Sequence, residues 1–554
     1  MMSGLNLSSY VSPFRRDTRN FDSGRQKDAE RTSALLPVAS ARVPVKTLEP
    51  VTGIGNVQRS RMRLSTARRS ALRRWIVRLA WSVFLIFATV VIGGAWSARR
   101  RLPDLEPWHR IVPRDFRASD LTARATLHDY VGIEDLAFNT VHEQIEQRLD
   151  TGARVPANRY NPDGISSPRR FDTDWNRTRI FEPQTTPIGG ALLVHGLTDS
   201  PYSFRTIGED LRARGYYVVA MRMPGHGTVP AGLTDVTWED WLAAVRLGAR
   251  HVRATIGANR PLVLVGYSNG GALVLKYAFD ALEGSGDPQA ARIVLLSPMI
   301  GVQPFAWLAR VISMLGPVPA FEKARWLDVY PEYNPFKFNS FPANAGLQTW
   351  RLTTALQRQI ERAASAGLGS RLPPVLTFHS LVDATVSTPA VVHAFYDVIA
   401  DERSELVLFD INRASGLAPF IQSEDATLLS RLTDRSPRKY RRTLVSNVDP
   451  ASLEVAERSI APGATAIEQR PLGVAWPRDV FSLSHVAIPF PLSDPVYGRD
   501  ETAVPLGTIR LGLLSPRGER AVFSVPSDTL MRLTCNPFFP YMEDRIDAWM
   551  GNGQ

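Results

Sequence analysis

Apolar and polar positions divide the chain into three stretches with different periodicities. Residues 1–70 are rich in Arg, Ser, Pro and Asp and have no sustained apolar period, which predicts a mostly disordered segment. Leu79–Ser97 then holds 19 consecutive residues without a charge. From Arg177 onward, short apolar runs alternate with helical patterns, which predicts an α/β fold built on a doubly wound, mostly parallel sheet.

The predicted strands are short and almost continuously apolar, as expected for strands that are covered on both faces. We place them at 178–183, 190–195, 216–221, 262–265, 292–297, 374–379 and 405–409. Helices are expected at 202–214 and 238–255. Ahead of the sheet, Ser119 or Asp120 is expected to cap a helix that runs to about His128. Ile133–Leu149 has an apolar face at every fourth position, which predicts an amphipathic helix packed on the folded body.

The uncharged stretch Leu79–Ser97 is long enough to cross a bilayer as a helix. Trp75, Trp81 and Trp96 lie near its ends, as interfacial aromatic residues do. A buried core helix and a cleaved signal peptide are the alternatives, and the more than seventy preceding residues argue against the second. Residues 64–78 hold five arginines, whereas 99–150 hold more acidic than basic groups. The positive-inside rule therefore predicts a single-pass protein of a bacterial inner membrane, with its C-terminal body on the non-cytoplasmic side.

The net charge of +11 suggests a nucleic-acid partner until it is mapped along the chain. Residues 1–78 contain 16 basic and 5 acidic groups, so the remainder is close to neutral. The basic character belongs to the N-terminal segment, and no nucleic-acid partner is expected. Cys535 is the only cysteine of the sequence, which excludes an internal disulfide and a cysteine-based zinc cluster.

The segment Pro261–Lys276 carries the sequence Gly-Tyr-Ser-Asn-Gly between an apolar strand and a helix-forming stretch. G-x-S-x-G in this strand–turn–helix setting is typical of a nucleophilic serine on a strained turn. The elbow glycines, Gly266 and Gly270, lack the Cβ atoms that such a turn would crowd. The following helix directs its N-terminal N–H groups to the same place. We therefore predict that Ser268 is a nucleophile, rather than part of an ordinary Gly/Ser turn.

An activated serine needs a general base and a group that orients the base. Asp383 lies one loop beyond the strand at 374–379 and is the expected orienting carboxylate; Asp410, after the next strand, is the second choice. The base is expected after the acid, in the chain order Ser, Asp, His. His393 and His485 are the two histidines there, and an apparent helix carries His393 away. His485 is therefore the predicted base.

The expected oxyanion donors are the backbone N–H groups of Leu197 and Asn269. Asn269 directly follows the nucleophile, and Leu197 follows the strand that ends at His195. His195 and His226 are expected to hold the loops beside the site in shape. This chemistry needs no metal and no cofactor.

These motifs resemble the serine esterases and lipases of the α/β-hydrolase superfamily, in particular its monoacylglycerol-lipase and serine-aminopeptidase-like branch. The resemblance runs from about Gly189 to the C-terminus and implies an α/β-hydrolase fold that carries a Ser-His-Asp triad. In that family a cap lies between the sixth strand and the acid, here at about 301–369. The cap is rich in Phe, Trp, Pro and Leu, which implies a hydrophobic substrate. The N-terminal anchor and an insertion at about 411–480, with clustered arginines and a possible hairpin, depart from the family pattern.

The sequence thus predicts four parts. They are a basic disordered segment at 1–74, a transmembrane signal anchor at 75–98, a juxtamembrane connector with helices at 99–185, and an α/β-hydrolase domain at 186–554. The expected activity is the hydrolysis of carboxylic esters of lipid-like substrates. A peptidase or acyltransferase using the same triad stays open, as does a non-catalytic, membrane-tethered binding protein.

Overall fold

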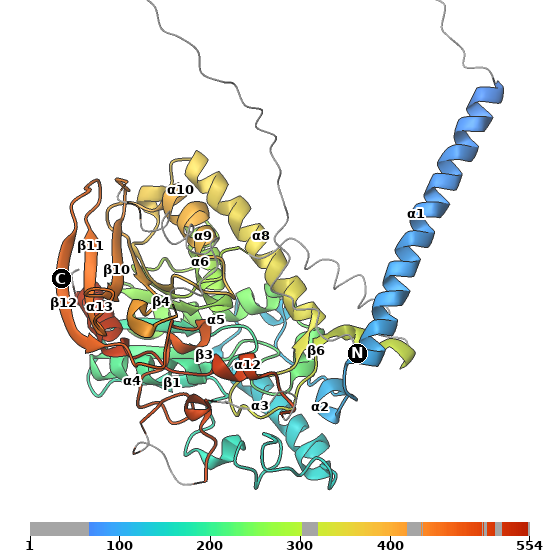
Figure 1. Ribbon diagram of the computed structural model, residues 1–554, viewed down its shortest axis with the longest axis horizontal. Helices are drawn as coiled ribbons and strands as arrows, with labels where there is room; N and C mark the ends of the chain where they lie inside the picture. The colour runs from blue at the N-terminus through green and yellow to red at the C-terminus, as the bar shows by residue number, and fades with distance from the viewer. Residues whose placement is uncertain are drawn as a thin grey trace, which may run out of the picture. The chain divides into compact units, whose positions relative to one another are not determined.

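The computed structural model describes residues 66–301, 319–417, 434, 436–500, 502, 507–515 and 523–551 (Figure 1). The chain divides into two units, Met1–Arg74 and Trp75–Gln554. The predicted disorder of residues 1–70 lies outside the described residues as far as residue 65, and helix α1 (Thr66–Arg101) begins within its last five. Everything below concerns the second unit.

A mostly parallel sheet forms the centre of this unit. Within the described residues it has ten strands, in the order β1-β3-β2-β4-β5-β8-β9-β10-β11-β12. The strands from β3 to β10 run parallel to one another, and β1, β11 and β12 pair antiparallel to their neighbours. The bounds are β1 Arg179–Phe181, β2 Gly189–Val194, β3 Tyr216–Met221, β4 Leu262–Tyr267, β5 Arg292–Leu296, β8 Val375–Ser380, β9 Glu405–Phe409, β10 Arg441–Asn447, β11 Glu454–Ile460 and β12 Glu468–Ala475.

Side chains alternate between two hydrophobic cores, one on each face of the sheet. Leu192 of β2 and Leu264 of β4 belong to the larger core, together with residues of α5 and α6. Their strand neighbours Leu193 and Val265 belong to the other core, with residues of α4 and α13. The strands are therefore apolar on both faces, and the predicted doubly wound α/β arrangement is confirmed.

Helices lie before, between and after the strands of the sheet. They are α3 Leu127–Gln144, α4 Arg205–Ala213, α5 Trp238–Ile256, α6 Asn269–Leu282, α8 Ala343–Ser365, α9 Thr388–Val391, α10 Asp397–Ile399, α12 Ser527–Met531 and α13 Phe539–Gly551. In α5, the Thr237 side chain accepts a hydrogen bond from the Asp240 N–H and the chain leaves the helix at Gly257, with φ 80°. Helix α8 packs along α6 in the larger core.

The upstream helices differ from the sequence prediction. Residues 118–120 form only a short 3-10 turn, so the helix expected from Ser119 to His128 is wrong. Helix α3 begins at Leu127 because Thr126 and Asp129 form a capping box, in which each side chain bonds the other's backbone N–H. The α-helix ends at Gln144, before the predicted end at Leu149, and a short 3-10 helix at Glu146–Arg148 follows it.

The insertion predicted at 411–480 adds strands to the sheet beyond β9. Strand β10 pairs parallel to β9, and β10, β11 and β12 form an antiparallel meander, so the possible hairpin is present (Figure 1). The Asn412 N–H donates to the Phe481 carbonyl at 2.7 Å, which brings the two ends of the insertion together. Residues 418–433 of the insertion lie outside the described residues, as do 302–318 of the predicted cap.

Helix α1 includes the stretch predicted to cross a membrane. In the part of the chain that the structure describes, no helix combines the length and the apolar character needed to span a bilayer. Four positions of the predicted span, Val90, Val91, Gly94 and Ala95, lie outside the described side chains. The membrane-spanning helix is therefore not confirmed.

Residues before the sheet pack into the same core and supply its most buried ion pairs. The guanidinium of Arg222, after β3, is fully buried and donates to both carboxylate oxygens of Asp115 at 2.8 Å and to Glu134 at 3.0 Å. Asp115 also accepts the Gly225 N–H at 2.8 Å, and Tyr130 donates to the Arg222 carbonyl. The loop after β3 is therefore held by side chains from a region about ninety residues earlier.

We predict that Asp115→Ala destabilises the protein by about 3–5 kcal/mol, because it leaves the buried Arg222 charge without its bidentate partner. Denaturant unfolding at pH 7 measures this change. Asp135→Ala is the matched control, since Asp135 is 57% exposed in its pair with Arg177 and should cost less than about 1 kcal/mol. Equal losses in the two variants would contradict the prediction.

Candidate active site

Ser268 occupies a strained turn between β4 and α6. Its φ of 55° and ψ of −118° lie in a region that residues with a Cβ seldom adopt. A Cβ on Gly270 would lie 1.9 Å from the Val194 carbonyl oxygen, and one on Gly266 would lie 2.6 Å from the Gly270 oxygen. Only glycine fits at either position, so the turn that presents Ser268 depends on both elbow glycines.

The turn is fixed by bonds to the neighbouring strand. The Ser268 N–H donates to the Leu296 carbonyl of β5 at 2.9 Å, and the Ser268 carbonyl accepts from the N–H groups of Gly271 and Met299. The backbone of the serine is thus bonded on both sides, which holds its side chain at the end of β4. This end is the edge at which open α/β sheets place their sites.

Asp383 and His485 come together although 102 residues separate them. His485 Nδ1 lies 2.8 Å from Asp383 Oδ2, and both side chains are buried. The other Asp383 oxygen accepts the N–H groups of Thr385 and Val386, at 2.8 and 3.0 Å. Burial alone would raise the pKa of Asp383, but the hydrogen bond and charge of His485 outweigh burial and hold that pKa well below its usual range. Asp383 is therefore ionised and fixes the imidazole orientation with Nδ1 as the donor.

His485 also contacts the elbow directly. Its ring stacks on Tyr267, the residue before Ser268, with centroids 5.3 Å apart. The Tyr267 hydroxyl donates to the His485 carbonyl at 3.2 Å. Ser484 caps the short 3-10 helix that begins at His485, and its hydroxyl donates to the Arg532 carbonyl at 2.7 Å. The structure therefore brings the predicted base beside the turn that carries Ser268.

The loop after β2 packs against the serine from the other side. A Cβ on Gly196 would lie 3.1 Å from the Ser268 Cβ, so Leu197 follows a glycine that packs closely against Ser268. Among the hydrogen bonds of the described residues, neither the Leu197 N–H nor the Asn269 N–H has an acceptor. Both N–H groups are therefore available to a ligand oxygen. The Asn269 side chain accepts from Thr349 of α8 at 3.4 Å, which links the elbow to the predicted cap region.

His195 holds the two loops together, as predicted. The Met223 N–H donates to its Nε2 at 3.0 Å, and its Nδ1–H donates to the Gly196 carbonyl at 2.8 Å. Burial lowers the pKa of His195 well below its ordinary value, so the ring stays neutral. His226 is buried beside it, and burial lowers its pKa to about 4. The buried Arg222 network therefore reaches the Leu197 loop through Met223 and His195.

Two charged residues near this loop were not predicted from the sequence. Asp199 is buried, its Oδ2 has no partner among the described residues, and burial raises its pKa. Burial lowers the pKa of the Lys337 ammonium, while the charge of Asp199 acts in the opposite direction. The Phe338 N–H donates to the Thr198 carbonyl at 2.7 Å, so the Lys337 segment is tied to the loop. The only local signal for this pair was an aspartate two residues after Leu197.

Two other candidates are occupied elsewhere. Asp410 is buried and bonded to Arg413 at 2.8 Å and to Ser446 at 2.6 Å, so it does not orient His485. His393 lies on the helical segment after Thr388, exposed and paired with Asp397 at 2.8 Å. Among the described residues, no cluster of three or more His, Cys, Asp or Glu could hold a metal ion.

Comparison with known proteins gives a family likeness over part of the chain. Residues 185–411 match the family model described as serine aminopeptidase, S33. A thermostable monoacylglycerol lipase of Bacillus sp. (strain H-257) is 26% identical over 189 residues, which cover 34% of this chain and 70% of that enzyme. The family match ends before His485.

Solved structures with a related arrangement include a metagenome-derived lipolytic enzyme, at 21% identity and a TM-score of 0.34 over 42% of this chain and 87% of that one. A monoglyceride lipase of Saccharomyces cerevisiae follows at 16% identity and 0.33, over 42% and 82%. With its mostly parallel sheet and the family match, the region has an α/β-hydrolase fold. At the family level, the chain resembles hydrolases of the esterase and monoacylglycerol-lipase type.

We predict that Gly270→Ala destabilises the protein by about 3 kcal/mol or more, because the new methyl group has no space beside the Val194 carbonyl. Gly132→Ala in α3 is the control, since its Cβ would meet no atom within 4 Å and alanine favours a helix by about 0.5–1 kcal/mol. Thermal and denaturant unfolding compare the two. A Gly270→Ala protein as stable as the wild type would show that the turn is not constrained as described.

Proposed function

We propose that the protein is a serine hydrolase that cleaves carboxylic esters of hydrophobic or lipid-like substrates. One observation carries the proposal: a hydrogen-bonded Asp383–His485 pair stacks on the strained turn that presents Ser268. A serine in this backbone conformation, next to an oriented imidazole, matches the requirements of an activated nucleophile.

In the proposed reaction, the Ser268 hydroxyl oxygen attacks the ester carbonyl carbon, and His485 Nε2 takes the hydroxyl proton. The carbonyl oxygen becomes an oxyanion that accepts hydrogen bonds from the free N–H groups of Leu197 and Asn269. When the bond from carbon to the alcohol oxygen breaks, His485 gives its proton to that oxygen and the alcohol leaves. Water then attacks the acyl-enzyme through the same base, which releases the acid and restores Ser268. Each oxyanion donor typically contributes about 3–4 kcal/mol to this kind of transition state.

We predict that kcat on 4-nitrophenyl butyrate falls by on the order of 10⁶ in Ser268→Ala and His485→Ala, and by about 10⁴ in Asp383→Asn. A fluorophosphonate probe should label the wild type and neither Ser268→Ala nor His485→Ala. His393→Ala is the control, because His393 is exposed and pairs only with Asp397. Full esterase activity in Ser268→Ala would reject the proposal, and an unlabelled, inactive, folded wild type would favour the binding-protein alternative.

The description of the matched family gives a second candidate, an aminopeptidase that uses the same triad. Such an enzyme must bind the α-ammonium group of its substrate, and the buried carboxylate of Asp199 near the Leu197 loop could serve this purpose. Lys337 opposes that role, since its charge acts on Asp199. The ratio of kcat/KM on 4-nitrophenyl butyrate to that on leucine 4-nitroanilide decides between them, and a ratio far above one supports the esterase.

Membrane attachment through Leu79–Ser97, with the catalytic domain outside the cytoplasm, stays a prediction from the sequence. We expect the full-length chain to remain in the membrane fraction after an alkaline carbonate wash, and a variant without residues 1–101 to be released. Protease added to intact spheroplasts should cleave the catalytic domain if the predicted orientation holds. Recovery of the full-length chain in the soluble fraction would contradict the attachment.

A further inference from the structure

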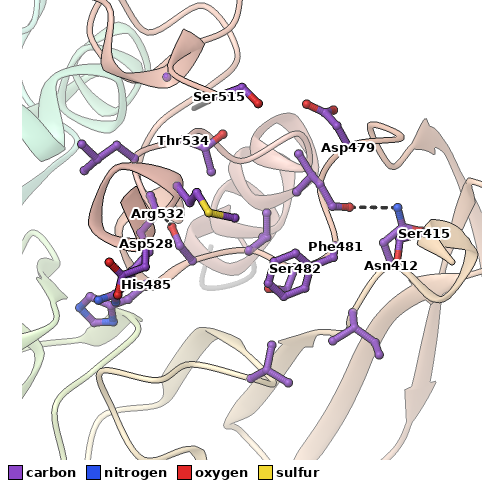
Figure 2. Close-up of a pocket in the computed structure, with 18 of the residues that line it drawn as sticks. Asn412, Ser415, Asp479, Phe481, Ser482, His485, Ser515, Asp528, Arg532 and Thr534 are labelled. Atoms are coloured by element: carbon purple, nitrogen blue, oxygen red, sulfur yellow. Dashed lines mark hydrogen bonds between the residues drawn. The ribbon is translucent and has the colours of Figure 1, made fainter. Parts of the chain in front are cut away.

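A cavity of about 700 Å³ opens beside the predicted base, within the 300–1,000 Å³ typical of small-molecule sites (Figure 2). Its wall includes His485, the preceding residues Leu483 and Ser484, and the residues on either side of Asp383, which are Val382 and Ala384. No described residue of its lining belongs to the elbow or to the Leu197 loop. The cavity therefore lies on the histidine side of the site and not on the oxyanion side.

The position of the cavity indicates which part of an ester it would accept in the proposed reaction. The carbonyl oxygen of an ester must face the oxyanion donors, whereas the departing alcohol oxygen must reach the base that protonates it. The alcohol part of the ester therefore leaves the reaction centre past His485. A cavity that borders His485 without bordering the oxyanion donors is suited to the alcohol part and not to the acyl part.

The cavity has an apolar mouth. Four large hydrophobic side chains that line it are exposed to solvent: Leu417, Phe481, Leu514 and Met531. Single exposed apolar residues are ordinary, but several gathered around one cavity mark a binding surface. In Figure 2, His485 lies at one end of the residues drawn, beside Asp528 and Arg532.

Three of the four Asp and Arg side chains on the described wall, Asp479, Arg499 and Arg532, already have partners. Arg499 forms a bidentate pair with Asp479, at 2.7 and 2.9 Å. Arg532 donates to the Thr385 hydroxyl in the loop of the catalytic acid. A ligand that brought its own charge would have to compete with these contacts. An uncharged hydrocarbon chain needs no such exchange.

We propose that this cavity binds the hydrocarbon part of the alcohol, so that preferred substrates are esters of long-chain aliphatic alcohols. The inference rests on the proposed function and adds its substrate class. In the step concerned, the acyl carbon–oxygen bond breaks, the alcohol oxygen keeps the electron pair and takes the proton from His485, and the chain stays in the cavity until release. Most of the wall comes from residues after 411, beyond the family match, so this specificity belongs to the C-terminal part of this chain.

Two ester series test the proposal. The first holds the acyl part at acetate and lengthens the alcohol from ethanol to 1-dodecanol; the second holds 4-nitrophenol and lengthens the acyl chain. We expect kcat/KM to rise with alcohol length in the wild type. Ser415→Trp and Ser515→Trp should fill the cavity from two separate wall segments and lower kcat/KM on dodecyl acetate at least about tenfold, with less than a twofold change on ethyl acetate.

Ser365→Trp is the matched control, because it adds the same side chain at an exposed position on α8 and should change neither series. An unchanged alcohol-length profile in both cavity variants would overturn the proposal. So would a loss confined to long acyl chains, which would assign the cavity to the acyl part.

Calorimetry separates this failure from failure of the proposed function. The Ser268→Ala protein should bind 1-dodecanol, and its double variant with Ser415→Trp should not. If the wild type also lacks esterase activity, binding with this pattern would retain the alcohol-chain site while rejecting the triad. Equal binding by both proteins would overturn the site itself.

Discussion

The close approach of Gly270 to the Val194 carbonyl is the constraint on which the site depends. It lets the end of β2 and the start of α6 touch, and this contact fixes both the strained backbone of Ser268 and the loop after β2. The free N–H groups of Leu197 and Asn269 lie on the two segments that meet there. A side chain at position 270 would move the two N–H groups apart and would also relax the backbone of Ser268, so the proposed nucleophile and its expected oxyanion site depend on the same packing contact.

The loops around this contact are held by a chain of polar contacts that starts far from the site. Asp115 and Glu134 neutralise the buried Arg222, and Asp115 also binds the backbone of Gly225. The Met223 N–H donates to Nε2 of His195, and the Nδ1–H of His195 donates to the Gly196 carbonyl oxygen. Burial keeps the ring neutral, so it can accept at one nitrogen while it donates at the other. The region ahead of the sheet is therefore part of what shapes the loop after β2, and its removal would expose an unpaired guanidinium in the core.

The sequence predicted those helices and strands whose ends are set by residues close together in the chain. The strand at 216–221 and the helix at 238–255 were placed to within one residue, because apolar runs, a capping threonine and a terminal glycine all lie within them or next to them. The elbow could be recognised from its two glycines, and His485 from the order of the chain. Contacts between distant residues gave no such signal: the pairing of Asp115 with Arg222, and the burial of Asp199 near Lys337, follow from the tertiary fold. The start of α3 was missed because the capping box at Thr126 outcompeted the weaker signal at Ser119.

The long insertion between β9 and His485 does not carry His485 away from the end of β9. Strand β10 continues the sheet beside β9, the meander turns back through β11 and β12, and the Asn412 N–H meets the Phe481 carbonyl, so the insertion begins and ends at one place. His485 lies four residues after that closure and is therefore positioned as it would be by a short loop following β9. The same closure places residues from both ends of the insertion on one wall of the cavity beside His485. An insertion that leaves the proposed base in position and adds a wall next to it can change which alcohol the proposed site accepts without disturbing the proposed triad, so the C-terminal part of the chain is where we expect its specificity to arise.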